Sequence, residues 1–231
     1  MKTRLIHYGE LVYHTLVFVL FAYAINIDLG LPPHMVTYAG RTKFYTIWNV
    51  CLSIVFYGFS SIVDFIHLLV SHEFHAIRKF RDYAFCSLLA PASVAVSFAF
   101  WGLYLANPDF LVPGEMKKYM PIDGFYNQVV HTAPVVTTLI EIIFVYHEPP
   151  TRHLIGCLGG LFYGSIYTAW VHWIAYMPGG FWSYPFLEVF SVGQRAGFFI
   201  GMYCFGFVWY FVGVLLMNAV WGKIYKKNKK E

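Results

Sequence analysis

The chain has 231 residues, of which 58% are hydrophobic and only 12% are charged, and its formal net charge at pH 7 is +4. Soluble domains carry about 25% charged residues, and a soluble fold of this length cannot bury so much apolar surface. The composition therefore predicts an integral membrane protein. Nucleic-acid binding is disfavoured, because the small excess of positive charge lies mainly in the C-terminal tail.

Six stretches with few charges are long enough to cross a bilayer core as helices, which takes about 20 residues. They cover residues 11–27, 44–68, 83–107, 124–146, 154–177 and 196–222. Open sheets cannot satisfy their backbone in lipid, and the stretches lack the alternating pattern of barrel strands. We therefore expect an all-α bundle of six transmembrane helices, formed by a single domain (residues 1–222) and followed by a basic tail (residues 223–231).

Lys and Arg concentrate at the N-terminus, in the connection after residue 68 and in the tail. Because positive charge marks the cytoplasmic side, both termini are expected in the cytoplasm. The first stretch also resembles a signal peptide, but its aromatic residues and His14 favour a retained helix. The last residues, 227–231, have the form of a retrieval signal for the endoplasmic reticulum. A basic cluster that binds anionic lipid fits equally, so the endoplasmic reticulum and the plasma membrane both stay open.

Polar residues recur every three or four positions along two of the predicted helices, which places them on one helical face. The set is Thr46, Asn49, Ser53, Tyr57, Ser60, Asp64 and His67 in the second stretch, and Asn127, His131, Thr138 and Glu141 in the fourth. We expect the Ser residues and Thr138 to join helices by hydrogen bonds. Ionisable residues inside a membrane are costly and point to function.

Depth decides which of these residues can act together. Thr46 and His131 both lie in the first turns of helices that start on the non-cytoplasmic side. Asp64 is about 27 Å from Thr46 along the helix axis, and Glu141 is about 15 Å from His131. A Thr46–His131 pair is therefore possible, but neither acid can complete a triad.

The chemistry of such a pair is nucleophilic catalysis. A hydroxyl needs a neighbouring base to become a nucleophile, and an imidazole can take that proton and return it to a leaving alcohol. The unpaired N–H groups at a helix start can stabilise an oxyanion. The spacing alone is weak evidence, because Thr at a helix start is usually a cap, and Thr37 and Thr42 are nearby alternatives.

The chain contains a series of short motifs: Lys43-Phe44-Tyr45-Thr46, Phe56-Tyr57-Gly58 with Asp64, Arg81-Asp82, Phe100-Trp101, Asn127 with His131-Thr132, Trp170-Val171-His172, and Trp182-Ser183-Tyr184-Pro185-Phe186-Leu187-Glu188. Together they resemble the family of androgen-induced and androgen-dependent TFPI-regulating proteins. The motifs follow one another in order from the second helix to the last connection. Two positions depart from the family pattern: Thr42 stands where Trp is usual, and Gln128 where His is common.

The resemblance implies six transmembrane helices and a threonine hydrolase that cleaves fatty acid esters of hydroxy fatty acids through an acyl-enzyme. It implies Thr46 as the nucleophile and His131 as the essential histidine, with no metal and no cofactor. The expected partners are the lipid ester and membrane lipids, while the oligomeric state stays open. The residues expected to contact the substrate are Lys43, Asn49, Asn127, Tyr184 and Glu188.

Two other functions fit parts of the pattern. A transporter or proton relay would use Asp64 and Glu141, but repeats and broken helices are not evident in the sequence. A carrier of b-type haem would pair histidines from the set His14, His67, His131 and His172. His67 and His131 start at opposite membrane faces, which disfavours that pairing.

Some residues have structural explanations. The glycines at positions 156, 160 and 164, and at 193, 197 and 201, recur every fourth residue and predict close helix packing. The four cysteines are expected to be buried apolar residues. His147 is expected in a connection at the cytoplasmic surface, together with His72, His75 and His153.

Overall fold

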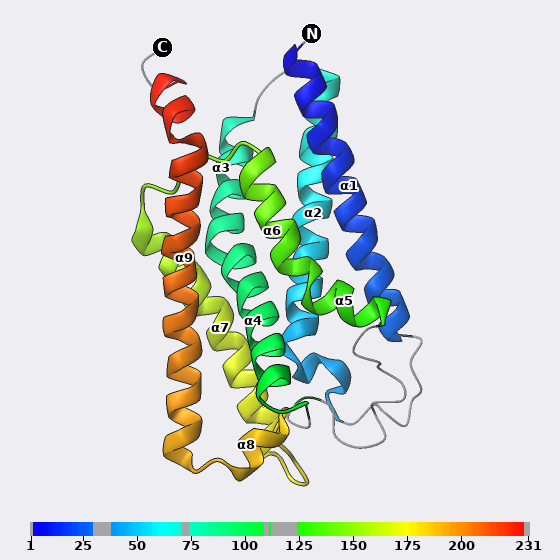
Figure 1. The fold of residues 1–231 in the computed structure, drawn as a ribbon, viewed down its shortest axis with the longest axis vertical. Helices are drawn as coiled ribbons and strands as arrows, with labels where there is room; N and C mark the ends of the chain where they lie inside the picture. The colour runs from blue at the N-terminus through cyan, green and yellow to red at the C-terminus, as the bar shows by residue number, and fades with distance from the viewer. Residues whose placement is uncertain (1, 30–37, 71–73, 109–110, 112–123, 229–231) are drawn as a thin grey trace.

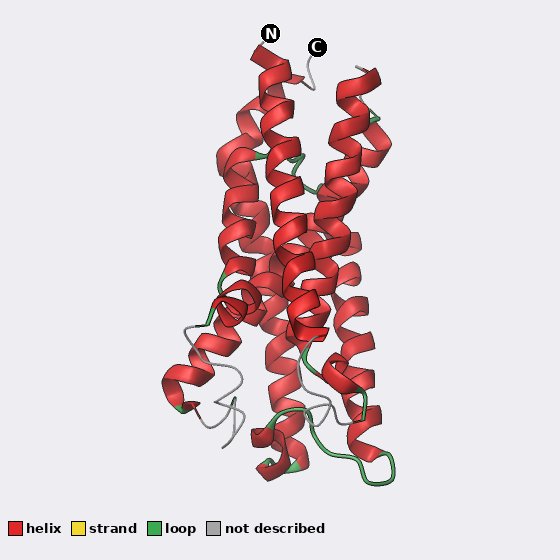
Figure 2. Cartoon of the chain, turned by 90° about the vertical axis from the view of Figure 1, so that its right-hand side faces the viewer, coloured by secondary structure: helices red, strands yellow, loops and turns green. Residues whose placement is uncertain are grey.

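The computed structural model describes residues 2–29, 38–70, 74–108, 111 and 124–228. Regular structure in these ranges is helical throughout, as Figure 2 shows, and the long helices follow one axis. The helices, labelled in Figure 1, are α1 (Lys2–Leu29), α2 (Tyr45–Val70), α3 (His75–Ala84), α4 (Ala90–Ala106), α5 (Phe125–His131), α6 (Ala133–Phe144), α7 (His153–Tyr176), α8 (Pro185–Val189) and α9 (Val192–Asn228). Two short turns complete them: the 3-10 turn η2 (Gly40–Lys43) and the π-helical turn η3 (Phe85–Leu89).

Five continuous helical segments in the described ranges are long and apolar enough to cross a membrane, namely His7–Ile27, Tyr45–Val70, His75–Ala106, His153–Tyr176 and Val192–Lys223. This confirms an all-helical integral membrane protein. The start of α1 and the end of α9 lie at the same end of the bundle (Figure 1), as an even number of crossings requires. The count of six and the cytoplasmic placement of the termini stay predictions. The basic tail is helical to Asn228, and residues 229–231 of the suggested retrieval signal lie outside the described residues.

The fourth predicted span is not one helix. It is broken at Thr132 into α5 and α6, which meet at a steep angle in Figure 1. Pro134 lies in the first turn of α6. In a continuous helix it would lack the N–H needed for a backbone hydrogen bond, and its ring would clash with the carbonyl four residues earlier. Residues 124–146 therefore form two helices rather than one continuous helix, and the break beside Pro134 follows directly after His131.

The third span begins earlier than expected. Instead of starting at residue 83, the helix runs from His75 through α3, η3 and α4 to Ala106. Arg81 was expected in a positively charged connection, but it lies inside this helix with only 3% of its surface exposed. Basic residues usually mark connections between membrane helices, so the local sequence does not indicate that Arg81 is buried.

The polar stripe of α2 faces the interior of the bundle, as predicted: Asn49, Ser53, Tyr57, Ser60 and Asp64 are all buried. The apolar side chains of Val55, Ile62 and Leu69, seven residues apart, are exposed on another face. Burial of polar groups and exposure of aliphatic ones is the arrangement expected of a helix whose outer surface meets lipid. The apolar core around the stripe is built mainly from α1, α2 and η3 (Val17, Phe21, Val50, Phe56, Tyr57, Phe85 and Leu89).

The two glycine rows behave differently. A Cβ atom at Gly160 would lie 2.9 Å from the backbone oxygen of Ser87, and one at Gly164 would lie 2.9 Å from the Tyr203 ring. Close packing of α7 is therefore confirmed. The row in α9 was predicted wrongly, because a Cβ at Gly193, Gly197 or Gly201 would meet nothing within 4 Å.

Candidate active site

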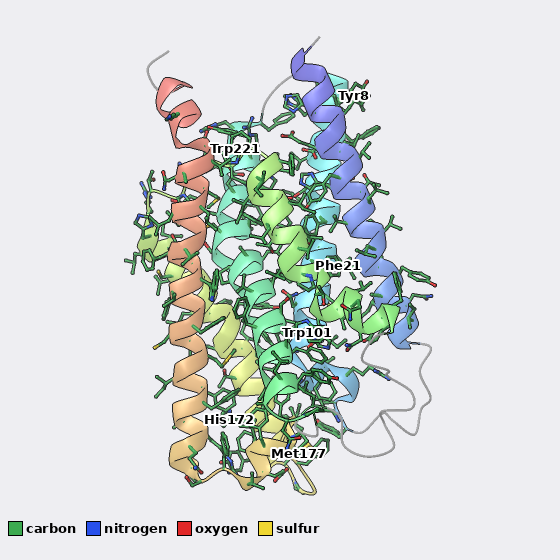
Figure 3. The ribbon with its side chains drawn as sticks, viewed as in Figure 1. Tyr8, Phe21, Trp101, His172, Met177 and Trp221 are labelled. Carbon is green, nitrogen blue, oxygen red and sulfur yellow. The ribbon has the colours of Figure 1, made fainter. Side chains whose placement is uncertain are left out.

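A cavity of about 1040 Å³ lies between the start of α2 and helices α4, α5, α7 and α9. It reaches the end of the bundle that carries α8, opposite the chain termini. Figure 3 marks this end with His172 and Met177, and the other end with Tyr8 and Trp221. Of the residues predicted to form the site, the cavity is lined by Lys43, Thr46, Asn127, His131, Tyr184 and Glu188.

Thr46 is the second residue of α2 and is partly exposed to the cavity. It lies in the first turn of a 26-residue helix, where backbone N–H groups point away from the helix and the dipole is positive. Thr42, the alternative nucleophile, lies in η2 outside the lining. Its hydroxyl donates to the carbonyl of Ala39 at 2.6 Å and accepts the indole N–H of Trp170 at 3.2 Å. Thr37 lies outside the described residues.

His131 is the last residue of α5 and is 8% exposed. Its ring stacks on Phe100 of α4, with ring centroids 3.6 Å apart and planes at 8°. The Nδ1 atom is buried and has no hydrogen-bond partner among the described residues. Aromatic stacking, rather than a carboxylate, therefore fixes the orientation of this imidazole.

The helix break beside His131 is held by hydrogen bonds. The indole N–H of Trp101 donates to the Thr132 hydroxyl at 3.1 Å, and that hydroxyl donates to the Gln128 side chain at 2.8 Å. Trp101 comes from α4, next to the ring that stacks on the histidine. The Phe100-Trp101 motif thus positions both His131 and the corner that follows it.

Thr46 of α2 and His131 of α5 line the same cavity. The described residues contain no direct hydrogen bond between the two side chains. In ligand-free enzymes such bonds are often long and tighten only when substrate is bound. Asp64 and Glu141 do not line the cavity, in agreement with the depth argument that kept both acids out of the site.

The connection between α7 and α9 closes the cavity over the start of α2. The hydroxyl of Tyr184 accepts the backbone N–H of Tyr45 at 3.2 Å, and the hydroxyl of Tyr167 donates to the backbone oxygen of Lys43 at 3.0 Å. Burial raises the pKa of Tyr184, so this phenol stays protonated at neutral pH. Glu188 accepts the backbone N–H of Trp182 at 2.7 Å, which explains the Glu in the motif as a support for the connection.

Lys43 places a cation at the mouth of the apolar cavity. Its side chain is only 9% exposed, and its ammonium lies 5.1 Å from the ring of Phe44 and 4.8 Å from the ring of Phe181. Burial, with a smaller effect from Arg41, lowers its pKa. Aromatic faces stabilise such a cation.

Asn49 takes a different position from the other predicted contacts. It is fully buried between α2 and α4, where its side-chain oxygen accepts the hydroxyl of Ser93 at 3.3 Å. It is not among the residues that line the cavity. Asn49 therefore joins α2 to α4 by a hydrogen bond. Asn127, which is 4% exposed, lines the cavity.

A second polar region lies toward the end of the bundle with the termini. Six buried ionisable residues from α1, α2, α3, α6 and the connection after α6 join in one network there: His14, Asp64, Arg81, Asp82, Glu141 and His147. His14 bridges Asp64 at 2.5 Å and the carboxylate of Glu141 at 3.2 Å. The network is neutral when both imidazoles are protonated, because three carboxylates then face three cations.

His147 was predicted as a surface residue, and that prediction was wrong. It is fully buried, with Nδ1 2.8 Å from Asp82 and Nε2 3.0 Å from Glu141. Burial acts to lower its pKa, but the two carboxylates outweigh burial and the pKa is raised. The sequence signal that could have found the network is the Arg81-Asp82 motif, whose charges are unexplained in a surface loop.

The network also bears on haem binding. Both ring nitrogens of His14 and of His147 face carboxylates. These imidazoles are engaged within the protein, which disfavours them as axial ligands. Within the described ranges, groups of three or more His, Cys, Asp or Glu are not arranged to hold a metal ion.

Comparison with known proteins places the chain among named relatives. The profile described as FAR-17a/AIG1-like protein matches residues 9–218. The human androgen-induced gene 1 protein is 28% identical over 201 residues, covering 84% of this chain and 82% of that protein. The human androgen-dependent TFPI-regulating protein is 30% identical over 200 residues, covering 86% and 85%. No solved structure matches.

Proposed function

The chain belongs to the FAR-17a/AIG1-like protein family, and from that premise we propose that it is a membrane-embedded threonine hydrolase of fatty acid esters of hydroxy fatty acids. The observation that supports the proposal is that Thr46 and His131 line one largely apolar cavity. The two residues are 85 positions apart in the chain and come from different helices. A nucleophile, a base and an apolar pocket are the three parts that hydrolysis of a lipid ester requires.

In the proposed first step, His131 takes the proton of the Thr46 hydroxyl, and the threonine oxygen attacks the ester carbonyl. The positive end of the α2 helix dipole stabilises the oxyanion. The bond between the carbonyl carbon and the alkoxy oxygen then breaks, and His131 returns the proton to the leaving hydroxy fatty acid.

In the second step, His131 takes a proton from water, and the hydroxide attacks the acyl group on Thr46. Collapse of this intermediate releases the second fatty acid and restores the threonine hydroxyl, to which the proton returns. Lys43, or Arg41 beside it, binds the free carboxylate of the branched lipid, because both cations line the cavity.

The test is hydrolysis of a branched fatty acid ester by purified protein, with Thr46→Ala and His131→Ala beside the wild type. Thr42→Ala and His172→Ala are the matched controls, since neither residue lines the cavity. We expect both site variants to lose at least about 100-fold in kcat, the lower range for a catalytic base, and the controls to stay active. Full activity of Thr46→Ala, or an inactive wild type across several lipid esters, would overturn the proposal.

The transporter alternative has a separate test. Asp64 and Glu141 are paired within the buried network and do not line the cavity, so the structure offers no specific support for a substrate path through them. Substrate flux into proteoliposomes that depends on Glu141, with no ester hydrolysis, would favour transport over the proposed function.

A further inference from the structure

The cavity is long in the direction of the bundle axis. Its lining on α7 runs from Gly156 to Thr168, with residues on one face at steps of three and four. Tyr167 marks the end near the proposed nucleophile, because its hydroxyl contacts the backbone of Lys43. Gly156 is eleven residues away, which corresponds to about 16 Å along the helix. The cavity therefore extends from the active-site end deep into the bundle.

Small residues create the space, and its walls are apolar. On α4 the lining includes Ala92, Ala95 and Ala99, and on α9 it includes Gly206. A Cβ at Gly206 would meet nothing within 4 Å, so the cavity is open beside this glycine. An elongated apolar space with polar groups at one end matches an extended hydrocarbon chain that has a reactive group at its tip.

The far end of the cavity is bounded by Tyr210. Its side chain is buried, and its ring and hydroxyl lie so close to Gly156 that a Cβ added there would overlap them. The hydroxyl also lies 3.3 Å from Nδ1 of His153, which holds the ring in place. Tyr210 of α9 and Gly156 of α7 thus form the end wall of the cavity. The contact of Tyr210 with His153, the first residue of α7, holds this wall in place.

We propose that one acyl chain lies lengthwise in this cavity, with its carboxyl or ester end at Lys43 and Thr46 and its terminal methyl group against Tyr210. The Tyr210–Gly156 wall then sets the longest chain that the protein accepts. The direction of the chain rests on the proposed function, while the length limit rests on the shape of the cavity alone.

Two substitutions move the limit in opposite directions. Tyr210→Ala removes the end wall and lengthens the space. Gly206→Leu introduces a side chain about 6 Å closer to the active-site end, four residues before Tyr210 on the same helix. Gly201→Leu is the matched control, because a Cβ there also meets nothing within 4 Å and the residue does not line the cavity.

The experiment measures displacement of a fluorescent fatty acid from purified protein by saturated fatty acids of increasing length. For the wild type and Gly201→Leu we expect affinity to rise by up to about fourfold per methylene, the value of hydrocarbon burial, and then to stop rising. The stopping point shifts to longer chains in Tyr210→Ala and to shorter chains in Gly206→Leu. If Tyr210→Ala does not fold, Gly206→Leu decides.

Two results would overturn the inference: no binding of fatty acids by the wild type, or an unchanged stopping point in Gly206→Leu. Hydrolysis of esters with the same series of acyl chains is measured in parallel. A length limit in binding without any hydrolysis would leave the inference standing and would refute the proposed function. Hydrolysis without a length limit would do the reverse.

Discussion

Replacing Glu141 by Gln tests whether the buried network joins the helices. The Glu141 carboxylate is fully buried and contacts both His14, at 3.2 Å, and His147, at 3.0 Å. The amide keeps the shape but removes one of three negative charges, so a buried network that is neutral with protonated imidazoles is left with an excess positive charge. Removing one partner of a buried ion pair typically costs about 3–5 kcal/mol. We expect Glu141→Gln to destabilise the protein by that amount.

The control for this substitution lies seven residues further along the chain. Glu148 pairs with His75 at 3.8 Å, and the His75 side chain is 70% exposed. Exposed pairs contribute about 0–1 kcal/mol, so Glu148→Gln should change stability little. The assay is reversible unfolding in mixed micelles, followed by helical circular dichroism. Equal unfolding curves for the two variants would refute the view that the network stabilises the contact of α1 with α6.

Three further predictions concern the site. Lys43→Met should raise KM for a substrate with a free carboxylate by roughly tenfold, the value of a charged hydrogen bond. Because the pKa of Lys43 is lowered, the wild-type KM should also rise with increasing pH, at a lower pH than an ordinary lysine would need to deprotonate. Gly160→Ala should destabilise the protein by about 1–3 kcal/mol in the same unfolding assay, because its Cβ would lie 2.9 Å from the Ser87 carbonyl oxygen. Tyr184→Phe should cost about 1–3 kcal/mol, since the Tyr45 N–H loses its acceptor.

One control measurement could contradict each of these three predictions. The methyl ester of the same lipid lacks the carboxylate, so an equal effect of Lys43→Met on its KM would exclude the ion pair. Gly201→Ala meets no neighbour and should be neutral, and an equal loss in both glycine variants would exclude the packing argument. An unchanged unfolding curve for Tyr184→Phe would show that the bond to Tyr45 does not stabilise the start of α2.

The periodic features of the fold could be predicted from the sequence. The polar stripe of α2 repeats at helical spacing, so the pattern fixes which residues share a face. The depth of Thr46 and His131 followed from the start of their helices, and both residues line the same cavity. In these cases a local property of one helix decides the outcome.

The features that escaped prediction depend on contacts between distant segments. His147 is buried because Asp82, 65 residues earlier, is beside it, and nothing in the local sequence of His147 indicates that partner. The unpacked glycine row at 193, 197 and 201 has the same spacing as the packed row of α7, but no atom of the described residues lies within 4 Å of a Cβ added there. Spacing shows that a helix can be approached closely, but it does not show whether another helix is there.

The break at Thr132 affects how the chain enters the membrane during synthesis. α6 has 12 residues and a length of about 18 Å, well short of the roughly 30 Å hydrocarbon core, and it contains Glu141. A segment with a proline in its first turn and an acid near its end is a poor substrate for insertion as a single unit. One partner of Glu141, His14 in α1, is made earlier, and the other, His147, follows six residues later. Insertion of the fourth segment is therefore coupled to assembly with helices already in the bilayer, and in a glycosylation reporter residues 124–146 should insert far better behind residues 1–123 than alone.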